Sequence, residues 1–129
     1  MILALDYGSR FVGVAITDGD ERLALRHSVI DLKEKDVFVE VKKIVLEEKV
    51  EKILVGLPIS LSGEDSEQTR KTRGFASGLK EVVGDEISVE LVDERFSSKE
   101  AERRVLAEGG KKEEAHAEAA RLILESYLR

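Results

Sequence analysis

The chain has 129 residues, close to the commonest size of a single domain and long enough to bury one core. Apolar residues make up 42% of it, which excludes a disordered chain, and the absence of cysteine excludes a disulfide scaffold and a thiolate metal site. With 21 basic and 27 acidic residues the net charge is −6. A nucleic-acid partner would therefore need local basic patches or bound cations to overcome the overall repulsion.

Neither a membrane span nor a signal peptide is indicated. No apolar run approaches the length that crosses a bilayer, and the N-terminal run Met1 to Leu5 meets Asp6 too early for a signal sequence. The chain contains no internal repeat, low-complexity tract or linker. We therefore expect one soluble, cytoplasmic domain spanning residues 1–129.

The first third of the chain predicts three antiparallel strands. Ile2 to Leu5 form a short apolar run, typical of a buried central strand, that ends at Asp6. Residues 11–17 alternate as a second strand and residues 23–30 as a third, separated by turns rich in glycine and aspartate. These strands predict an antiparallel meander.

Beyond Ile30 the hydrophobic period changes to that of helices alternating with strands. Residues 37–45 show the spacing of one helical face, and residues 52–57 read as a fourth strand closed by Pro58. A second helix turns its apolar positions inward, and residues 87–92 form a fifth strand that ends in Asp93-Glu94. The inward positions of that second helix are Phe75, Leu79, Val82 and Val83.

The C-terminal third predicts two more helices. Ser97 to Glu100 match a capping box, and Gly109-Gly110 supply the glycine that ends a helix. The last helix, residues 113–128, is expected to bury Ala115, Ala119, Leu122, Ile123 and Tyr127. The order β-β-β-α-β-α-β-α-α predicts an α/β fold: a mixed five-stranded sheet with helices on both faces.

Acidic residues follow two of the predicted strands. Asp6 ends the central strand, where α/β proteins collect their ligands, and Asp93-Glu94 end the fifth. Each acid alone is also ordinary turn chemistry, and Asp93-Glu94 beside Arg95 can be a solvated strand end. Together, carboxylates on neighbouring strand ends are the oxygen ligands that Mg²⁺ prefers, and such cations can clamp a phosphodiester.

His116 is a third candidate for the site. It lies at the start of the last helix on one face with Ala119 and Ala120, whose small side chains would let that helix approach the sheet near Asp6. A lone histidine on an apolar face is more often a core residue than a ligand. His27, in the middle of a strand, is interpreted as structural.

Basic residues cluster at the same ends of the elements as the acids. Arg70, Lys71 and Arg73 begin one helix, and Arg95 follows the fifth strand. Such charges are commonly solvated, but a phosphate backbone approaching a metal site would need them there. The expected nucleic-acid contacts are Arg10, Arg70, Lys71, Arg73 and Arg95.

Four stretches, in order along nearly the whole chain, resemble the YqgF/RuvX family, the Holliday junction resolvase group of RNase H-like nucleases. They are Leu5-Asp6-Tyr7-Gly8-Ser9-Arg10-Phe11-Val12-Gly13-Val14-Ala15, Val55-Gly56-Leu57-Pro58 with Gly63, Asp93-Glu94-Arg95-Phe96-Ser97-Ser98, and Ala119-Ala120 with Leu124 and Tyr127-Leu128. Any one stretch would be weak, but four in the family's order are specific.

The resemblance implies an RNase H-like fold and a metal-dependent nuclease with Mg²⁺ or Mn²⁺ as cofactor. The substrate would be nucleic acid, either branched DNA or the precursor of 16S rRNA, with no membrane partner, and the chain would act as a monomer or homodimer. The resemblance also implies that Asp6 and Glu94 correspond to two acids of the metal site.

The chain departs from the family pattern at His116, where the family usually has aspartate three residues before the Ala-Ala pair. Either His116 serves as ligand or base, or Glu113 takes its place, or the site is impaired. An imidazole ligand suits Mn²⁺ better than Mg²⁺. The alternative function is a non-catalytic RNase H-like scaffold in rRNA maturation or transcription. The kinase and actin group, which opens with a similar hairpin, needs two such domains and so a longer chain.

Overall fold

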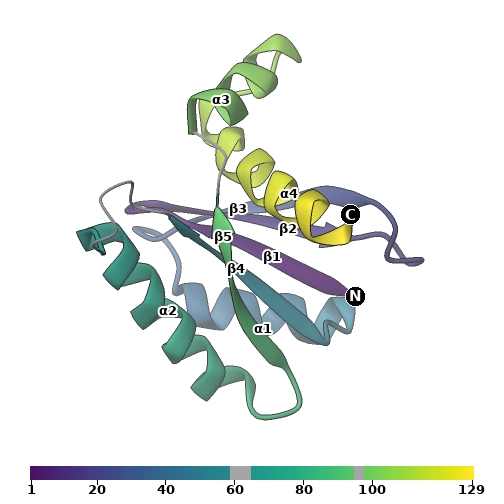
Figure 1. Ribbon diagram of the computed structural model, residues 1–129, viewed down its shortest axis with the longest axis vertical. Helices are drawn as coiled ribbons and strands as arrows, with labels where there is room; N and C mark the ends of the chain where they lie inside the picture. Colours follow the sequence, from purple (N-terminus) through teal and green to yellow (C-terminus); the bar gives the residue numbers. More distant parts are fainter. Residues whose placement is uncertain (59–64, 95–97) are drawn as a thin grey trace.

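The computed structural model describes residues 1–58, 65–94 and 98–129, and its centre is a five-stranded sheet (Figure 1). Its strand order is β3-β2-β1-β4-β5, so β1 is central. The strands are β1 (Ile2–Tyr7), β2 (Phe11–Thr17), β3 (Ala24–Asp31), β4 (Lys52–Pro58) and β5 (Ser88–Glu94).

The pairing of the strands makes the sheet mixed. β1 and β2 are antiparallel, as are β2 and β3, whereas β4 runs parallel to both β1 and β5. The parallel pairs are reached through helical crossovers, since a parallel neighbour cannot be reached by a tight turn. The predicted meander, the mixed sheet and the central position of Asp6 are thus confirmed.

Helices cover both faces of the sheet, as the sequence predicts. α1 (Val37–Glu48) and α2 (Glu67–Val83) lie on one face, and α4 (Ala115–Leu128) crosses the other over β1, β2 and β3 (Figure 1). α3 (Ser98–Ala107) packs against α4 beyond the sheet and is joined to it through a short 3-10 turn, η1 (Lys112–Glu114).

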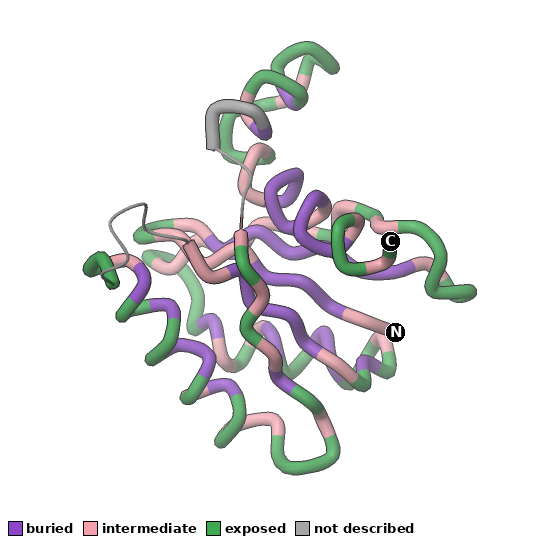
Figure 2. Tube along the Cα trace, viewed as in Figure 1, coloured by how far each residue is buried: buried purple, intermediate pink, exposed green. Residues whose placement is uncertain are grey.

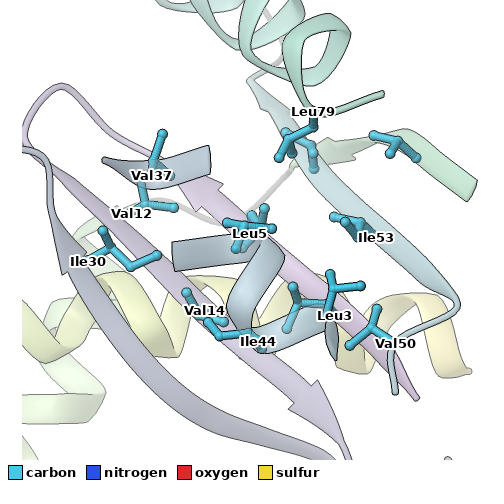
Figure 3. Packing of buried hydrophobic residues seen from close by; sticks show 14 of the residues in the cluster. Leu3, Leu5, Val12, Val14, Ile30, Val37, Ile44, Val50, Ile53 and Leu79 are labelled. Carbon is cyan, nitrogen blue, oxygen red and sulfur yellow. The ribbon is translucent and has the colours of Figure 1, made fainter. Parts of the chain in front are cut away.

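The two faces of the sheet carry side chains of different size. Large residues of β1 and β2, such as Leu3, Leu5 and Val14, point toward α1 and α2 and form the main core (Figure 3). The opposite face presents the small residues Ala4 and Ala15 to α4. Figure 2 shows the buried residues gathered in the central strands and on the inner sides of the helices. Because Ala4 and Ala15 lie beneath it, α4 can approach the backbone of β1 and β2 closely.

The helix ends follow local sequence signals. Asp36 caps α1 by accepting from the amides of Phe38 and Val39, and Ser66 caps α2 by accepting from Thr69. Gly109 adopts a left-handed φ of 80° just after α3, as predicted from the glycine pair. The predicted capping box at Ser97 lies outside the described residues.

Two details of the prediction are wrong. Tyr127 is 37% exposed rather than buried, because its hydroxyl turns outward to accept a hydrogen bond from Lys52. Residues 112–114 form η1, so α4 begins at Ala115 rather than at residue 113. Among the described residues, no helix combines the length and hydrophobicity that a bilayer crossing requires.

Candidate active site

Asp6 stands near the carboxyl end of the central strand on the face covered by α4. It follows Ala4 at the two-residue period of β1, and Ala4 packs against α4. Its side chain is only 18% exposed. The residue opposite Asp6 on β2 is Gly13, which has no side chain to fill the space beside the carboxylate.

Glu94 reaches Asp6 across the intervening strand. It is the last residue of β5, and β4 separates β5 from β1. Gly56 of β4 makes the crossing possible, because a Cβ there would stand 3.3 Å from Oε2 of Glu94 and would overlap the side chain of Ile123. The sequence offered a signal, since a glycine inside an apolar strand often marks a close approach.

The electrostatics of this pair are strongly perturbed. Burial, the negative charge of Asp6 and a hydrogen bond to Asp6 together raise the pKa of Glu94 to about 9, with burial the largest cause. At neutral pH Glu94 therefore holds a proton and shares it with Asp6. Asp93, the other acid of the pair, is exposed and points away.

His116 adds an imidazole on the other side of Asp6. Its Nδ1 lies 3.8 Å from Oδ2 of Asp6, and its ring contacts Phe11 at a centroid distance of 5.4 Å. A Cβ on Gly13 would overlap the carbonyl oxygen of His116, and one on Gly8 would lie 3.7 Å from its ring. Both glycines thus give this part of α4 room beside the acid, as the sequence suggested.

A small pocket of about 70 Å³ opens between Asp6 and the helices. The remaining lining residues come from α3, η1 and α4 and include an ion pair of Lys112 with Glu102 at 3.7 Å. They are Glu102, Lys112, Ala115, His116 and Ala119. Glu113, the alternative ligand, is exposed and does not line this pocket.

The carboxylate pair fits a divalent cation. Two carboxylates held together by one proton are the donor set in which a hard cation can replace that proton. In the described part of the chain, no three acidic or histidine side chains stand close enough together to form a complete metal cluster. Asp6 and Glu94 are therefore the pair that would hold the ion, with His116 as the nearest further donor.

The described basic candidates are paired with acids or backbone oxygens. Arg10 lies 3.2 Å from Asp31, and the α2 residues pair within their own helix start. There Lys71 meets Glu67 at 3.2 Å, Arg73 meets Asp65 at 3.1 Å, and Arg70 donates to the Asp65 carbonyl at 2.9 Å. Arg95 lies outside the described residues. His27 is exposed and contacts Ser28, in keeping with a structural role.

Two residues missed by sequence reasoning fix the start of α2 beside the site. The Gln68 amide donates to the carbonyl of Tyr7 at 2.7 Å, directly after Asp6 in the chain. The Thr69 hydroxyl donates to the carbonyl of Pro58 at 3.2 Å, at the end of β4. These bonds bring the start of α2, which carries Arg70, Lys71 and Arg73, to the same edge of the sheet as the carboxylates. Neither residue type carries a sequence signal for such a role.

The sheet order and the crossing helix define an RNase H-like fold, which solved structures share. Thermus thermophilus RuvC in complex with a Holliday junction substrate has a TM-score of 0.58 at 15% identity, over 98% of this chain and 92% of that one. The Fowlpox virus resolvase in complex with Holliday junction DNA has a TM-score of 0.54 at 9% identity, over 99% of each chain. At these identities the likeness concerns the fold alone.

Comparisons of the sequence with known proteins show which family of this fold the chain belongs to. A family model described as "RuvX: Holliday junction resolvase" matches residues 1–129. A protein of Maridesulfovibrio salexigens named "Putative pre-16S rRNA nuclease" is 40% identical over 98% of this chain and 96% of its own length. One of Dictyoglomus turgidum with the same name is 38% identical over 98% and 92%. The chain belongs to the RuvX Holliday junction resolvase family, and the sequence prediction of a nuclease-type enzyme is confirmed at this level.

Proposed function

We propose that this chain is a metal-dependent endonuclease that hydrolyses phosphodiester bonds in structured nucleic acid. The observation that carries the proposal is the contact of Asp6 with Glu94, which holds its proton at neutral pH because its pKa is about 9. Placing two carboxylates together in a half-buried site is costly unless a cation or proton binds between them. Asp6 lies 3.8 Å from His116, and no lysine or arginine among the described residues pairs with either acid to offset that cost.

Each residue of the site has a proposed role. Asp6 and Glu94 hold Mg²⁺ or Mn²⁺, and His116 is the third donor or orients the attacking water. A bound cation would lower the pKa of a water and neutralise charge on the phosphoryl oxygens. Arg10, Arg70, Lys71 and Arg73 exchange their present partners for phosphates of the substrate, and Arg95 adds a fifth contact.

The proposed substrate is the precursor of 16S rRNA or a Holliday junction. The names of the relatives at 38–40% identity support the rRNA precursor. The family description and the fold shared with RuvC support the junction. A cleavage assay that offers both substrates to the same preparation, with Mn²⁺ and with Mg²⁺, distinguishes them.

The assignment of the site is tested by Asp6→Asn. This change keeps the shape of the side chain but removes one ligand charge, so the fold should persist and divalent-dependent cleavage should fall by about a hundredfold or more. Asp93→Asn is the matched control, because Asp93 is an exposed acid one residue from Glu94. If Asp6→Asn cut as fast as the parent chain, the assignment would be wrong.

A non-catalytic scaffold is the second candidate function. It is supported by His116 in the place of the family's usual acid, and by the lack of a complete three-residue metal cluster in the described part of the chain. Divalent cations separate the two candidates, because a ligand that binds only the folded state raises the melting temperature. An enzyme should be stabilised by millimolar Mn²⁺, whereas a scaffold without a metal site should not.

A further inference from the structure

A buried acid close to the site has no role in the proposed chemistry. Glu118 lies two residues after His116 on α4, and its side chain is only 1% exposed. Its carboxylate faces away from Asp6, into a group of arginines. Arg121 of the same helix binds both of its oxygens, at 2.6 and 2.9 Å.

The other arginines come from different elements. Arg26 of β3 donates to Oε1 of Glu118 at 2.9 Å, and Arg104 of α3 lies 3.7 Å from Oε2. Arg26 also pairs with Glu108, just beyond the end of α3, at 2.8 Å. Through Arg26, an outer strand of the sheet is thus joined to α4 and to the end of α3 at the same time.

The ion pairs of Arg26 with Glu118 and Glu108 lie where they can affect the dimensions of the candidate site. All residues lining the pocket except Asp6 come from α3, η1 and α4. The pocket therefore depends on how these helices sit on the sheet. The buried apolar cluster between α4 and the sheet has alanine at three of its six positions, Ala4, Ala15 and Ala120, and such short side chains interlock less than larger ones.

Apolar side chains in place of Glu118 and its arginines would stabilise the packing of α4 as well as these ion pairs do. Burying a carboxylate costs several kcal/mol, and apolar residues of similar volume often replace buried ion pairs without loss of stability. What directional ion pairs add is a fixed geometry, since the guanidinium fork binds a carboxylate in few orientations.

We propose that Glu118 and Arg26 are a positioning pair that holds the first turns of α4, and with them His116, over Asp6. The consequence for metal binding rests on the proposed function, but the positioning itself does not. Neither residue touches the reacting groups, so their effect is transmitted through the helix.

The test compares Arg26→Gln with Lys52→Gln. Arg26→Gln cuts the link from β3 but leaves Glu118 paired with Arg121, so the chain should fold. Lys52→Gln removes a hydrogen bond of 2.8 Å to Tyr127 at the far end of α4, together with an ion pair to Glu90, and serves as the control for a stability loss alone. Should Arg26→Gln fail to fold, Arg26→Lys, which keeps the charge without the fork, supplies the same comparison.

The readouts are amide hydrogen exchange and the rise in melting temperature caused by Mn²⁺. In Arg26→Gln, exchange across residues 115–120 should become about tenfold faster, because local opening of this segment becomes easier. The Mn²⁺-induced rise should shrink in the same variant, since weaker binding stabilises less. Lys52→Gln should lower the melting temperature. Its hydrogen exchange across residues 115–120 and its Mn²⁺-induced rise in melting temperature should match those of the parent.

Two results are informative in opposite directions. Unchanged exchange across residues 115–120 in Arg26→Gln would overturn the positioning role, whatever happens to melting temperature. A parent chain that Mn²⁺ does not stabilise would contradict the proposed metal site instead, while the exchange comparison would still decide whether the pair positions α4.

Discussion

At the scale of single residues, the close pair of carboxyl groups of Glu94 and Asp6 distinguishes the candidate site from the apolar core around it. Glu94 crosses β4 over Gly56 to reach Asp6, and its pKa of about 9 reports the cost of that position for an ionised carboxyl. An unfavourable position of this kind is typical of a functional site, because a cation can bind between the two carboxylates in place of the proton.

Glu94→Gln should stabilise the chain without metal and remove its cleavage activity. Burial and Asp6 raise the pKa of Glu94 from 4.5 to about 9, so its contribution to stability is complete below about pH 4.5 and is lost as pH rises toward 9. Glutamine cannot ionise. In EDTA the variant should therefore melt a few degrees higher than the parent at pH 8, with the difference vanishing near pH 4.

Thermal melts of both chains across that pH range, followed by a cleavage assay with Mn²⁺, give the measurement. Asp93→Gln offers the control, since Asp93 is exposed at the same strand end. A variant that melts with the parent at every pH would show that Glu94 is not buried against Asp6 in solution.

His116→Asp should change the preferred metal. Aspartate supplies the hard oxygen that Mg²⁺ favours, whereas imidazole favours Mn²⁺, so the ratio of cleavage rates with Mg²⁺ and Mn²⁺ should rise about tenfold or more. His116 lies 3.8 Å from Asp6, and its ring packs against Phe11 at an interplanar angle of 37°. Aspartate at this position would stand beside Asp6, so the variant should be less stable than the parent without metal, and a bound cation should offset that loss.

The measurement is cleavage with each metal alone, alongside the melting temperature. Equal metal ratios in the parent and the variant would show that position 116 does not act on the cation. A drop in melting temperature with no change in ratio would place His116 among packing residues.

At the scale of elements, α4 can approach the sheet closely because two residues beneath it have no side chain. Gly13 and Gly56 lie on two strands beneath the helix, and a Cβ on either would overlap atoms of α4. With Ala4 and Ala15 they form a shallow face on which a helix can rest with His116 above Asp6.

Gly13→Ala should lift the N-terminal end of α4. Its methyl group would overlap the carbonyl oxygen of His116, a backbone atom that cannot move alone. We expect a loss of about 1–3 kcal/mol and a matching loss of Mn²⁺-induced stabilisation. Denaturant unfolding with and without Mn²⁺ measures both.

Gly74→Ala is the matched control for that change. A Cβ on Gly74, in the exposed middle of α2, meets nothing within 4 Å, so alanine should stabilise the helix by up to about 1 kcal/mol. If Gly13→Ala were as well tolerated as Gly74→Ala, α4 would not contact β2 as closely as described.

At the scale of the whole molecule, an acidic chain must bind a polyanion through a few local contacts. The net charge is −6, and the basic residues at the site edge are held by acids such as Asp31, Glu67 and Asp65. These pairs keep the cations in place, and exposed pairs of this kind cost little to exchange for phosphate.

Substrate binding should therefore depend strongly on salt. If four or five phosphates are contacted, the logarithm of the association constant should fall with that of salt concentration with a slope of roughly −4. Arg70→Gln should reduce the slope by about 1, while Lys42→Gln, an exposed lysine of α1 outside the expected contacts, should leave it unchanged. Fluorescence anisotropy titrations with an inactive Asp6→Asn chain measure these slopes, and a slope near zero would exclude a nucleic-acid partner.

The sequence by itself determined the elements and the family. Period-2 and period-3.6 patterning placed all five strands and the helices within a few residues, because burial of one face dictates those periods. The family prediction is confirmed by the match over residues 1–129. Asp6, Glu94 and His116 were identified as candidates from strand ends, a helix start and the resemblance.

Only the tertiary structure decided how those residues meet. That Glu94 passes over Gly56, that His116 rather than Glu113 faces Asp6, and that Arg26 joins Glu118 across 92 positions in the chain all depend on which elements lie side by side. Local periodicity carries the direction of a side chain relative to its own helix or strand. It carries no information on the partner that a packed neighbour presents, because that contact forms between segments distant in sequence.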